Sequence, residues 1–582
     1  MDFFDILKFI GGVSLFLFGM NCMGGALEKK AGGSLSSLLK KFTSNKYTGF
    51  LLGLVVTTLI QSSAATTVIV VGLVNSGVMT LAQSVGVIIG ANVGTTVTAW
   101  ILSLTGIGSG SFIVQMFKPS SFVPIIAFIG VILYVFVKNS KKKDLGMICL
   151  GFAVLMFGME TAAEAVSGLN EIPQFTDLFT LFKNPVLGIL AGAALTAILQ
   201  SSSASVGILQ ALCITGKVTY GAALPIILGQ NIGTCITAMV SSIGADKNAK
   251  RAAVVHLSFN ALGSILIMLL FYPLNYFFKF GIVDKAATTF SIAVIHTLCN
   301  VVSTAVFLPG SAILEKVAVA VVREGKSQPV RKEIILDERL FINPSVAIEQ
   351  SRQAVMRMAH EAIVAFSDSV TLVDKYSDEK AAKIKEDEER IDKYEDIIDS
   401  YLVRLNSQQL TEENSRELTK LLHVTAGFER ISDHAVHMSI HAKELAEKKL
   451  SLTDDGLREL SVITKAVLEA IDMTTTAFCE NNTELASSVE PLEQVVDKLT
   501  VKAKSNHIER MLKGDCDNET GLVFSDLLAV LERASDHCSD IAASLVEIPL
   551  GNMDIHEYIH GVKTDSREFA EKYKEYKQKY AF

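Results

Sequence analysis

The feature that most constrains this chain is an internal repeat centred on two copies of one polar tripeptide. Gln61-Ser62-Ser63 recurs as Gln200-Ser201-Ser202. At the same offset of 139 residues, segments 57–99 and 196–238 share 16 of 43 residues without a gap. A register held over that length indicates two structural units with the same internal fold. The fold must therefore accommodate this tripeptide twice.

The repeated units lie in a strongly apolar part of the chain. Hydrophobic residues make up 49% of the sequence, and no Asp, Glu, Lys, Arg or His occurs between Tyr47 and Phe117. Because a membrane-spanning helix needs about 20 apolar residues, we expect residues 1–310 to form a membrane domain. The candidate spans are residues 4–27, 80–103, 121–138, 145–167, 220–243, 252–273 and 288–309.

Two further apolar stretches, at about 48–76 and 185–215, carry the Gln-Ser-Ser tripeptides near their centres. A straight helix through lipid would turn these polar groups toward hydrocarbon, which costs several kcal/mol for each unsatisfied group. A helical hairpin that enters and leaves the membrane on one side, with the tripeptide at its buried tip, avoids that cost. We therefore predict two re-entrant hairpins.

The positions of lysine and arginine test this topology, because cytoplasmic loops are rich in both. If both hairpins are re-entrant, the basic loops within 29–46, 138–143 and 247–251 fall on one face with the C-terminal part of the chain. We expect the N-terminus outside the cell and the C-terminal domain in the cytoplasm. The first repeat, about 4–138, then makes three full crossings, so the second, about 145–309, is inverted. Inverted repeats with broken elements at mid-membrane are typical of secondary transporters.

The C-terminal part has a different composition, dense in Asp, Glu and Lys. Its apolar residues recur every three or four positions, which predicts six long helices. Glu429-Arg430-x-x-Asp433-His434 is repeated as Glu532-Arg533-x-x-Asp536-His537 at an offset of 103, which indicates two three-helix units. We expect an all-α chain, with a linker at 311–345, a soluble domain at 346–570 and a tail at 571–582.

Hydroxyl and amide side chains near the predicted helix breaks are the candidate ligands. Free backbone N–H groups at helix N-termini attract anions. The candidates for an oxyanion substrate are Gln61, Ser62, Ser63, Gln200, Ser201, Ser202, Ser203, Asn92, Asn231, Thr95 and Thr234. Oxygen-rich groups of this kind also suit Na⁺, and its candidate ligands are Thr57, Gln61, Thr66, Thr196, Gln200, Ser205, Asn92 and Asn231. The alternative is that these small polar residues only join helices together.

In the soluble part, Glu429, Asp433, Glu532 and Asp536 share helix faces next to His434 and His537. Carboxylates clustered with histidines are candidate ligands for a divalent metal. Solvated helix faces with i,i+4 pairing are the commoner reason for such residues, and both interpretations stay open. No nucleophile–base pair or nucleotide-binding loop points to an enzyme.

These motifs resemble the sodium-dependent phosphate cotransporter family, the type II Na⁺/phosphate symporters and their bacterial relatives, over about residues 5–310. The segment Leu336-Asp337-x-Arg339-Leu340 … Pro344-x-x-Ala347 and the Glu-Arg-x-x-Asp repeats look like the PhoU-type regulatory domain fused to many bacterial members. The resemblance implies inorganic phosphate as substrate, Na⁺ as coupling ion and a regulatory cytosolic domain. One departure is Ala64, where the second repeat has Ser203.

Electrostatics indicates why the substrate needs a coupling ion. Moving a phosphate dianion inward against 100 mV costs about 4.6 kcal/mol, from about 2.3 kcal/mol for each charge. Two Na⁺ would cancel that charge. We therefore expect inward Na⁺/phosphate symport across the plasma membrane, the inner membrane of a bacterium.

Several alternatives remain open from the sequence. They are a transporter of another anion, a phosphate exporter, and a phosphate-binding membrane sensor that does not transport. The soluble domain is in addition a candidate contact for phosphate-signalling partners and for a second copy of the chain in a homodimer.

Overall fold

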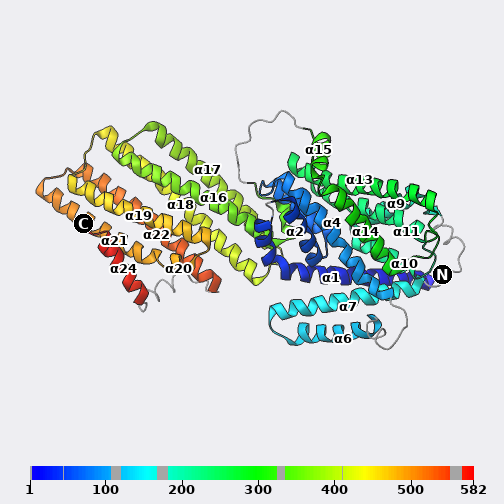
Figure 1. The fold of residues 1–582 in the computed structure, drawn as a ribbon. Helices are drawn as coiled ribbons and strands as arrows, with labels where there is room; N and C mark the ends of the chain where they lie inside the picture. Colours follow the sequence, from blue (N-terminus) through cyan, green and yellow to red (C-terminus); the bar gives the residue numbers. More distant parts are fainter. Residues whose placement is uncertain are drawn as a thin grey trace. The chain divides into compact units, whose positions relative to one another are not determined.

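The computed structural model describes residues 3–42, 45–106, 119–166, 181–323, 335–408, 410–550 and 567–582. These residues are almost entirely helical (Figure 1), and within them no strand is formed beyond one isolated bridge between Thr219 and Ala286. The expectation of an all-α chain is therefore confirmed. The chain divides into two compact units, unit 1 at Met1–Val346 and unit 2 at Ala347–Phe582.

Unit 1 contains the helices of both repeats. They are α1 (Phe3–Phe42), α2 (Lys46–Ile60), α3 (Ser63–Asn75), α4 (Leu81–Ser103), η1 (Leu104–Gly106), α6 (Pro119–Val131), η2 (Ile132–Phe136), α7 (Ser140–Val166), α9 (Pro185–Leu199), α10 (Ser202–Cys213), α11 (Tyr220–Gly233), α12 (Cys235–Ser241), α13 (Lys247–Phe278), α14 (Thr289–Phe307), α15 (Ser311–Val321) and η4 (Glu338–Ile342). Helix α15 and η4 lie in the segment 311–345, of which residues 324–334 are outside the described part.

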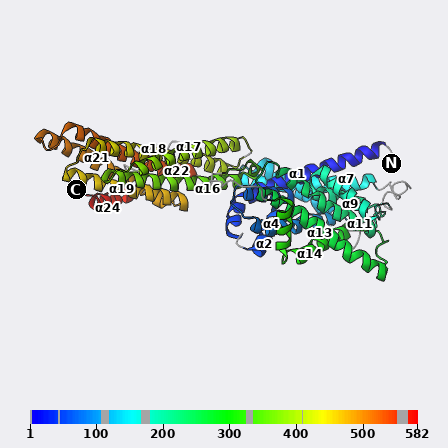
Figure 2. The same cartoon turned by 90° about the horizontal axis from the view of Figure 1, so that it is seen from above.

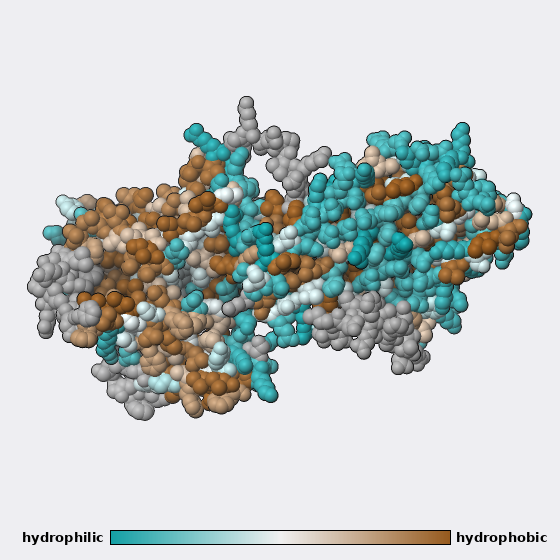
Figure 3. All heavy atoms as spheres, turned by 180° about the vertical axis from the view of Figure 1, so that it is seen from behind, coloured by the Kyte–Doolittle hydropathy of each residue, from teal (hydrophilic) through white to brown (hydrophobic). Residues whose placement is uncertain are grey.

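Six helical segments of unit 1 are long and apolar enough to cross a membrane, namely Phe4–Lys30, Leu81–Ser103, Lys141–Val166, Tyr220–Ser241, Lys247–Phe278 and Thr289–Phe307. The predicted span at 121–138 is not among them, because its helical segment, Ser121–Phe136, is shorter. Large apolar side chains point outward from unit 1, and Phe136, Ile198 and Phe277 are each at least 76% exposed. Figure 3 shows the contrast between the units, with apolar residues over much of the surface of unit 1 and hydrophilic residues over much of unit 2. Exposed apolar surface on this scale is what lipid covers, so the chain is an integral membrane protein.

Polar contacts define two opposite faces of unit 1. At one face, which we call the basic face, Lys29 pairs with Asp144 at 3.1 Å and Lys46 donates to the carbonyl of Pro309 at 2.9 Å. At the opposite face, Lys8 pairs with Glu164 at 3.0 Å. Lys8 and Lys29 both lie on α1, and at about 1.5 Å per residue they are about 32 Å apart. That distance matches the roughly 30 Å hydrocarbon core of a bilayer.

The two hairpins enter unit 1 from different faces. Helix α2 begins beside the Lys46–Pro309 contact, and Asn75 at the end of α3 accepts from the backbone N–H of Asp246 at 2.7 Å, so both ends of hairpin 1 lie at the basic face. Helix α9 begins beside Lys183, which pairs with Asp284 at 2.8 Å at the opposite face. After α10, the carbonyl of Val218 accepts from Ala287 N at 2.8 Å in the same region.

Each hairpin arm has 12 to 15 residues, or about 18–22 Å of helix, which is too short to span the core. The re-entrant hairpins and the inverted repeats predicted from the sequence are confirmed.

Glycines hold each hairpin against the helix that follows it. A Cβ atom on Gly53 or Gly90 would lie 2.0 Å from a backbone carbonyl oxygen of the facing helix, so α2 and α4 touch backbone to backbone. Gly192 and Gly229 make the same contact, at 2.1 Å, between α9 and α11. The Gly-x-Asn-x-Gly pattern therefore serves close helix packing, and it places the asparagines beside the hairpins.

Unit 2 is a bundle of six long helices, as predicted. They are α16 (Pro344–Asp374), α17 (Asp378–Asn406), α18 (Glu412–Lys448), α19 (Asp454–Glu480), α21 (Val489–Lys513) and α22 (Asn518–Leu550). The short helix α20 (Thr483–Ala486) lies between α19 and α21, and α24 (Arg567–Lys579) follows α22. Figures 1 and 2 show the long helices side by side. Fully buried phenylalanines, among them Phe366, Phe428 and Phe524, fill the core between them.

Candidate functional site

The two Gln-Ser-Ser tripeptides form helix breaks of the same geometry. Gln61 ends α2 with φ 59° and ψ 21°, and Gln200 ends α9 with φ 53° and ψ 23°, a left-handed conformation that is uncommon for residues other than glycine. Ser62 and Ser201 then cap α3 and α10, with their Oγ atoms accepting from the N–H of Ala65 at 3.1 Å and of Ala204 at 3.2 Å. Each tip thus turns the N-terminus of a helix into the membrane interior, where it attracts an anion.

The two tips differ in how their glutamines are held. The Nε2 of Gln61 donates to the carbonyl of Thr58 at 2.6 Å, and its Oε1 accepts from Thr98 on α4 at 2.8 Å. Gln200 is exposed, and its side chain makes no hydrogen bond to any residue that the structure describes. Ser63, Ser202 and Ser203 are each at most 7% exposed. The first tip is therefore tied to α4, while the glutamine of the second tip is unengaged.

The asparagines and threonines of the Gly-x-Asn-x-Gly-Thr segments are buried and mostly bonded within their own helices. Asn92 donates to Ile88 O at 2.9 Å, Thr95 to Ala91 O at 3.0 Å and Thr234 to Gln230 O at 2.9 Å. Asn231 differs, because its Oδ1 lies 3.1 Å from Nε2 of His296 on α14. The second repeat is also broken at Thr234, between α11 and α12, where α4 of the first repeat runs on.

Paired hydroxyls behind the tips are bonded in one repeat and unbonded in the other. In hairpin 1, Thr57 donates to Thr66 Oγ1 at 3.0 Å. Their equivalents in hairpin 2, Thr196 and Ser205, are fully buried, yet neither hydroxyl has a partner among the described residues. The same holds for both amide atoms of the fully buried Gln230 on α11.

Buried polar groups without partners are rare and destabilising. The hydroxyl oxygens of Thr196 and Ser205 are therefore suited to a bound cation such as Na⁺.

The structure brings into this region three residues that are not among the predicted ligands, Thr98, Gln230 and His296. A signal existed for two of them. Thr98 is identical to Thr237 in the repeat, and Gln230 is a polar residue inside an apolar helix directly before Asn231. His296 lies outside the matched segments of the repeat.

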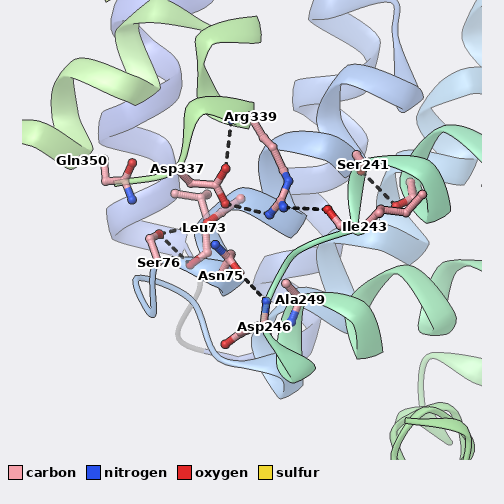
Figure 4. A network of polar contacts seen from close by, with 12 residues as sticks. Leu73, Asn75, Ser76, Ser241, Ile243, Asp246, Ala249, Asp337, Arg339 and Gln350 are labelled. Atoms are coloured by element: carbon pink, nitrogen blue, oxygen red, sulfur yellow. Dashed lines mark hydrogen bonds and ion pairs between the residues drawn. The ribbon is translucent and has the colours of Figure 1, made fainter. Parts of the chain in front are cut away.

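A short segment near the end of unit 1 packs against hairpin 1 (Figure 4). Arg339 pairs with Asp337 at 3.0 Å and donates to the carbonyl of Ile243 at 3.2 Å. Next to it, Leu340 is fully buried and lies over Gly72 of α3, where an added Cβ atom would be 2.7 Å from Leu340 Cδ2. The segment that leaves unit 1 is therefore in direct contact with the second arm of the first hairpin.

In unit 2, two groups of three carboxylates each bring their oxygens within 4.8 Å of one another. One group joins Asp392 and Glu395 of α17 with Glu429 of α18. The other joins Glu493 and Asp497 of α21 with Asp536 of α22. Hard divalent cations prefer oxygen ligands of this kind, so the residues present fit such a metal.

Only two of the four predicted metal ligands belong to these carboxylate groups. Glu429 and Asp536 belong to the two groups, whereas Asp433 and Glu532 do not, and Glu532 pairs with Lys504 at 2.8 Å. Sequence reasoning missed the partners on α17 and α21, although Asp392-Lys393 and Asp497-Lys498 repeat at an offset of 105. Metal binding by these residues stays a prediction.

Crowding of these carboxylates makes the stability of unit 2 sensitive to pH and metal. Burial, and then neighbouring carboxylates, raise the pKa of Glu429 to about 7 and the pKa of Glu493 to about 9. The folded state therefore favours the protonated forms of both side chains. The stabilisation that depends on their protonation is complete below pH 4.5 and is lost as pH rises through about 7 for Glu429 and about 9 for Glu493. Without divalent metal, we expect the calorimetric unfolding temperature of unit 2 in the full-length protein to fall between pH 6 and 9.

Manganese at 100 times its Kd should restore about 2.7 kcal/mol at pH 8.5, or about 5–10 °C for a domain of this size. The matched variant D392N/E493Q removes one ligand from each group. We expect it to lose the response to manganese, and an undiminished response in this variant would contradict the metal assignment.

Comparisons with known proteins agree with these features. Residues 15–164 and 173–296 match the family described as Na⁺/Pi-cotransporter, and residues 355–441 and 460–545 match the PhoU domain. The chain is 24% identical over 564 residues to the Salmonella typhimurium (strain LT2) protein named "Putative inorganic phosphate export protein YjbB", covering 95% of this chain and 99% of that one. It is 30% identical over 305 residues to YqeW of Bacillus subtilis (strain 168), covering 52% of this chain and 94% of YqeW.

Two further similarities are more local. Over 126 residues the chain is 35% identical to human sodium-dependent phosphate transport protein 2B, covering 21% of this chain and 18% of that one. The crystal structure of PhoU from Pseudomonas aeruginosa aligns with 35% of this chain and 98% of its own, at 24% identity and a TM-score of 0.34.

Proposed function

This chain belongs to the Na⁺/Pi-cotransporter family and carries a PhoU domain toward its C-terminal end, and we propose that it imports inorganic phosphate in symport with Na⁺. Phosphate transport follows from the family. Coupling to Na⁺, inward direction and regulation by the PhoU domain are the proposed parts. In this proposal the N-terminus is outside the cell, and the basic face of unit 1 and the whole of unit 2 are cytoplasmic, because basic loops face the cytoplasm.

The observation that carries the proposal is the unpaired state of Thr196 and Ser205 in hairpin 2. Their hydroxyl oxygens are buried without partners, whereas the equivalent Thr57 and Thr66 bond to each other. A Na⁺ ion bound there would satisfy both oxygens. It would also lie close to the N-terminus of α10, where it can offset part of the charge of a bound phosphate.

Phosphate itself would be held by neutral donors. The backbone N–H groups that open α3 and α10 and the hydroxyls of Ser63, Ser202 and Ser203 supply hydrogen bonds at the two tips. Apart from Lys217 beyond α10, neither hairpin between Tyr47 and Gly77 or between Val186 and Lys217 contains a cationic side chain. The positive charge must therefore come from co-bound Na⁺, which couples the two fluxes. Tips that open toward opposite faces would expose the site alternately to each side.

Export is a second candidate direction, and the similarity to YjbB over nearly the whole of both chains favours it. The direction of a symporter follows the sum of its gradients, so the same site serves both. Uptake of labelled phosphate into proteoliposomes, with Na⁺ or K⁺ outside, tests the proposal. We expect uptake only with Na⁺. Equal uptake in K⁺ would exclude sodium coupling, and binding without uptake would favour a sensor.

The same assay identifies the substrate class. Unlabelled arsenate, which has the shape of phosphate, should compete with labelled phosphate, and a dicarboxylate such as succinate should not. Stronger competition by succinate would favour a carrier of another anion.

The segment that leads from unit 1 into the PhoU domain places Leu340 over Gly72 of hairpin 1 and Arg339 on the carbonyl of Ile243, and we propose that regulation passes through it. We expect Arg339→Ala to remove the salt bridge to Asp337 and the hydrogen bond to Ile243 O, and thereby to uncouple regulation from transport. The measurement is the ratio of phosphate uptake into cells loaded with low and with high internal phosphate. In the variant this ratio should approach 1, while uptake itself persists.

A matched control for this experiment is Ile342→Ala, because Ile342 lies in the same short helix η4 and is 45% exposed. It should keep the wild-type ratio. If Arg339→Ala also keeps that ratio, regulation does not pass through this contact.

A further inference from the structure

The second sequence duplication builds a hollow in unit 2 that the transport mechanism does not use. Helices α18 and α22 pack against each other, and each contributes the Arg, Asp and His of its Glu-Arg-x-x-Asp-His motif. The hollow has a volume of about 410 Å³, and its lining is Arg430, Asp433, His434, His437, Arg533, Asp536 and His537. We call it the arginine–histidine pocket.

The two arginines carry the permanent positive charge of this pocket, and Arg430 also interacts electrostatically with Glu395 and Glu429. Neither Arg430 nor Arg533 has a hydrogen-bond or ion-pair partner within the described part of the chain. Both residues are solvent-exposed and line the hollow. The aspartates face other groups. Asp433 shares a hydrogen bond with Glu388 on α17, and Asp536 belongs to the carboxylate group with Glu493 and Asp497. The pocket therefore presents two guanidinium groups without hydrogen-bond partners in the described chain, and its two lining aspartates lie against carboxyl groups of α17 and α21.

Histidines add ring nitrogens without hydrogen bonds among the described residues, and Nδ1 of His537 lies 3.8 Å from Oδ2 of Asp540. The rings of His434 and His537 stack with centroids 5.3 Å apart and planes inclined by 13°. The Nδ1 atom of each ring is buried and makes no hydrogen bond among the described residues. Buried polar atoms of this kind are normally satisfied by a protein group, a water or a ligand. Of the lining residues, Asp536 belongs to a group of close metal-ligand atoms in the described chain and none of the three histidines does, so the histidines favour another kind of ligand.

The pocket is longer than a single phosphate ion needs. A second hollow of about 250 Å³ shares Arg430 and His537 with it and adds His423 and Asp540, so the two adjoin along the groove between α18 and α22. Arginine binds phosphoryl oxygens through two parallel hydrogen bonds. Two arginines on facing helices, with imidazole nitrogens between them, match an anion that carries more than one phosphoryl group.

We propose that the arginine–histidine pocket binds a di- or oligophosphate group, with Arg430 and Arg533 each gripping one phosphoryl unit. Inorganic pyrophosphate or polyphosphate and a nucleoside di- or triphosphate share this chemistry. The ligand would give unit 2 a phosphorus-containing signal of its own, separate from the phosphate that crosses the membrane. The assignment does not depend on the transport proposal.

Calorimetric binding of pyrophosphate to the full-length protein in detergent, with EDTA to remove metals, tests the assignment. We expect one site per chain, weakened at least about 100-fold in R430Q/R533Q, because loss of a charged hydrogen-bonding partner costs about 2–5 kcal/mol. R430K/R533K retains the charges but not the planar forks and should bind about 10-fold more weakly than wild type. The control variant is Arg458→Gln, because the Arg458 side chain on α19 is 73% exposed, and it should bind pyrophosphate as the wild type does.

Further measurements identify the class of ligand and separate this pocket from the transport site. Competition by ATP would identify a nucleotide as the natural ligand class, and competition by polyphosphate alone would identify the inorganic one. Gln200→Ala should bind pyrophosphate normally, so a failed transport site and a failed pocket give different results. Absence of binding in the wild type, or equal binding by R430Q/R533Q and R430K/R533K, would overturn the assignment. So would binding that requires Mg²⁺ and survives both substitutions, because the anion would then lie on metal.

Discussion

Replacing Thr196 by Val and Ser205 by Ala should abolish Na⁺-dependent phosphate transport without destabilising the protein. The two hydroxyls have no partner among the described residues and are fully buried. Exchanging unpaired buried polar atoms for apolar ones of similar shape is neutral or stabilising. The thermal unfolding temperature without Na⁺ should therefore stay constant or rise, while transport at a fixed Na⁺ concentration falls by at least about 100-fold, the equivalent of about 2.8 kcal/mol of lost ion binding.

Two matched variants separate this effect from a general loss of hydroxyl groups. Thr161→Val on α7 removes a hydroxyl that is bonded to Phe157 O at 2.8 Å and is remote from the hairpins in sequence, so transport should persist. Thr57→Val breaks the bonded pair in hairpin 1 and should lower the unfolding free energy by about 1 kcal/mol. Normal Na⁺ activation in the T196V/S205A protein would remove these oxygens from the sodium site.

Gln200→Ala and Gln61→Ala should both abolish coupled phosphate flux but should differ in stability. The side chain of Gln200 is exposed and makes no hydrogen bond among the described residues, so its removal should leave the unfolding temperature unchanged. Gln61 is bonded to Thr58 O and Thr98, and losing these contacts should cost about 1–3 kcal/mol. The measurements are labelled phosphate uptake in proteoliposomes and thermal unfolding in detergent.

Glycine at the same positions provides the control for backbone strain. Both glutamines have positive φ, a conformation in which glycine is relaxed. Gln200→Gly should therefore be at least as stable as Gln200→Ala and equally inactive. If either alanine variant transports at the wild-type rate, the corresponding tip is not part of the site.

Much of the fold followed from pattern and physical chemistry alone. Each tripeptide places polar groups at the centre of an apolar stretch, where a straight helix would turn them toward lipid. This cost predicted both hairpins, and the left-handed conformations of Gln61 and Gln200 confirm them. The distribution of lysine predicted which loops share a face, and the Lys29–Asp144 contact agrees with it. These inferences succeeded because they depend on local composition and on the cost of unsatisfied polar groups in lipid.

The details of the site depend on contacts between distant segments, which a repeat cannot reveal. The repeat predicts equal roles for Thr57 and Thr196, yet only the former has a bonded partner. Asn92 and Asn231 are also equivalent in sequence, but the partner of Asn231 is His296, on a helix outside the matched segments. Likewise, Asp392 and Asp497 join the carboxylate groups of unit 2 only because α17 and α21 pack against α18 and α22.

The most direct test of the central claim follows both ions at once in proteoliposomes. With an inward Na⁺ gradient and equal phosphate on both sides, labelled phosphate should accumulate above its external concentration, and labelled Na⁺ should enter in a fixed ratio to it. Both fluxes should disappear in T196V/S205A. Phosphate that only equilibrates, or Na⁺ influx that is the same with and without phosphate, would contradict symport through hairpin 2.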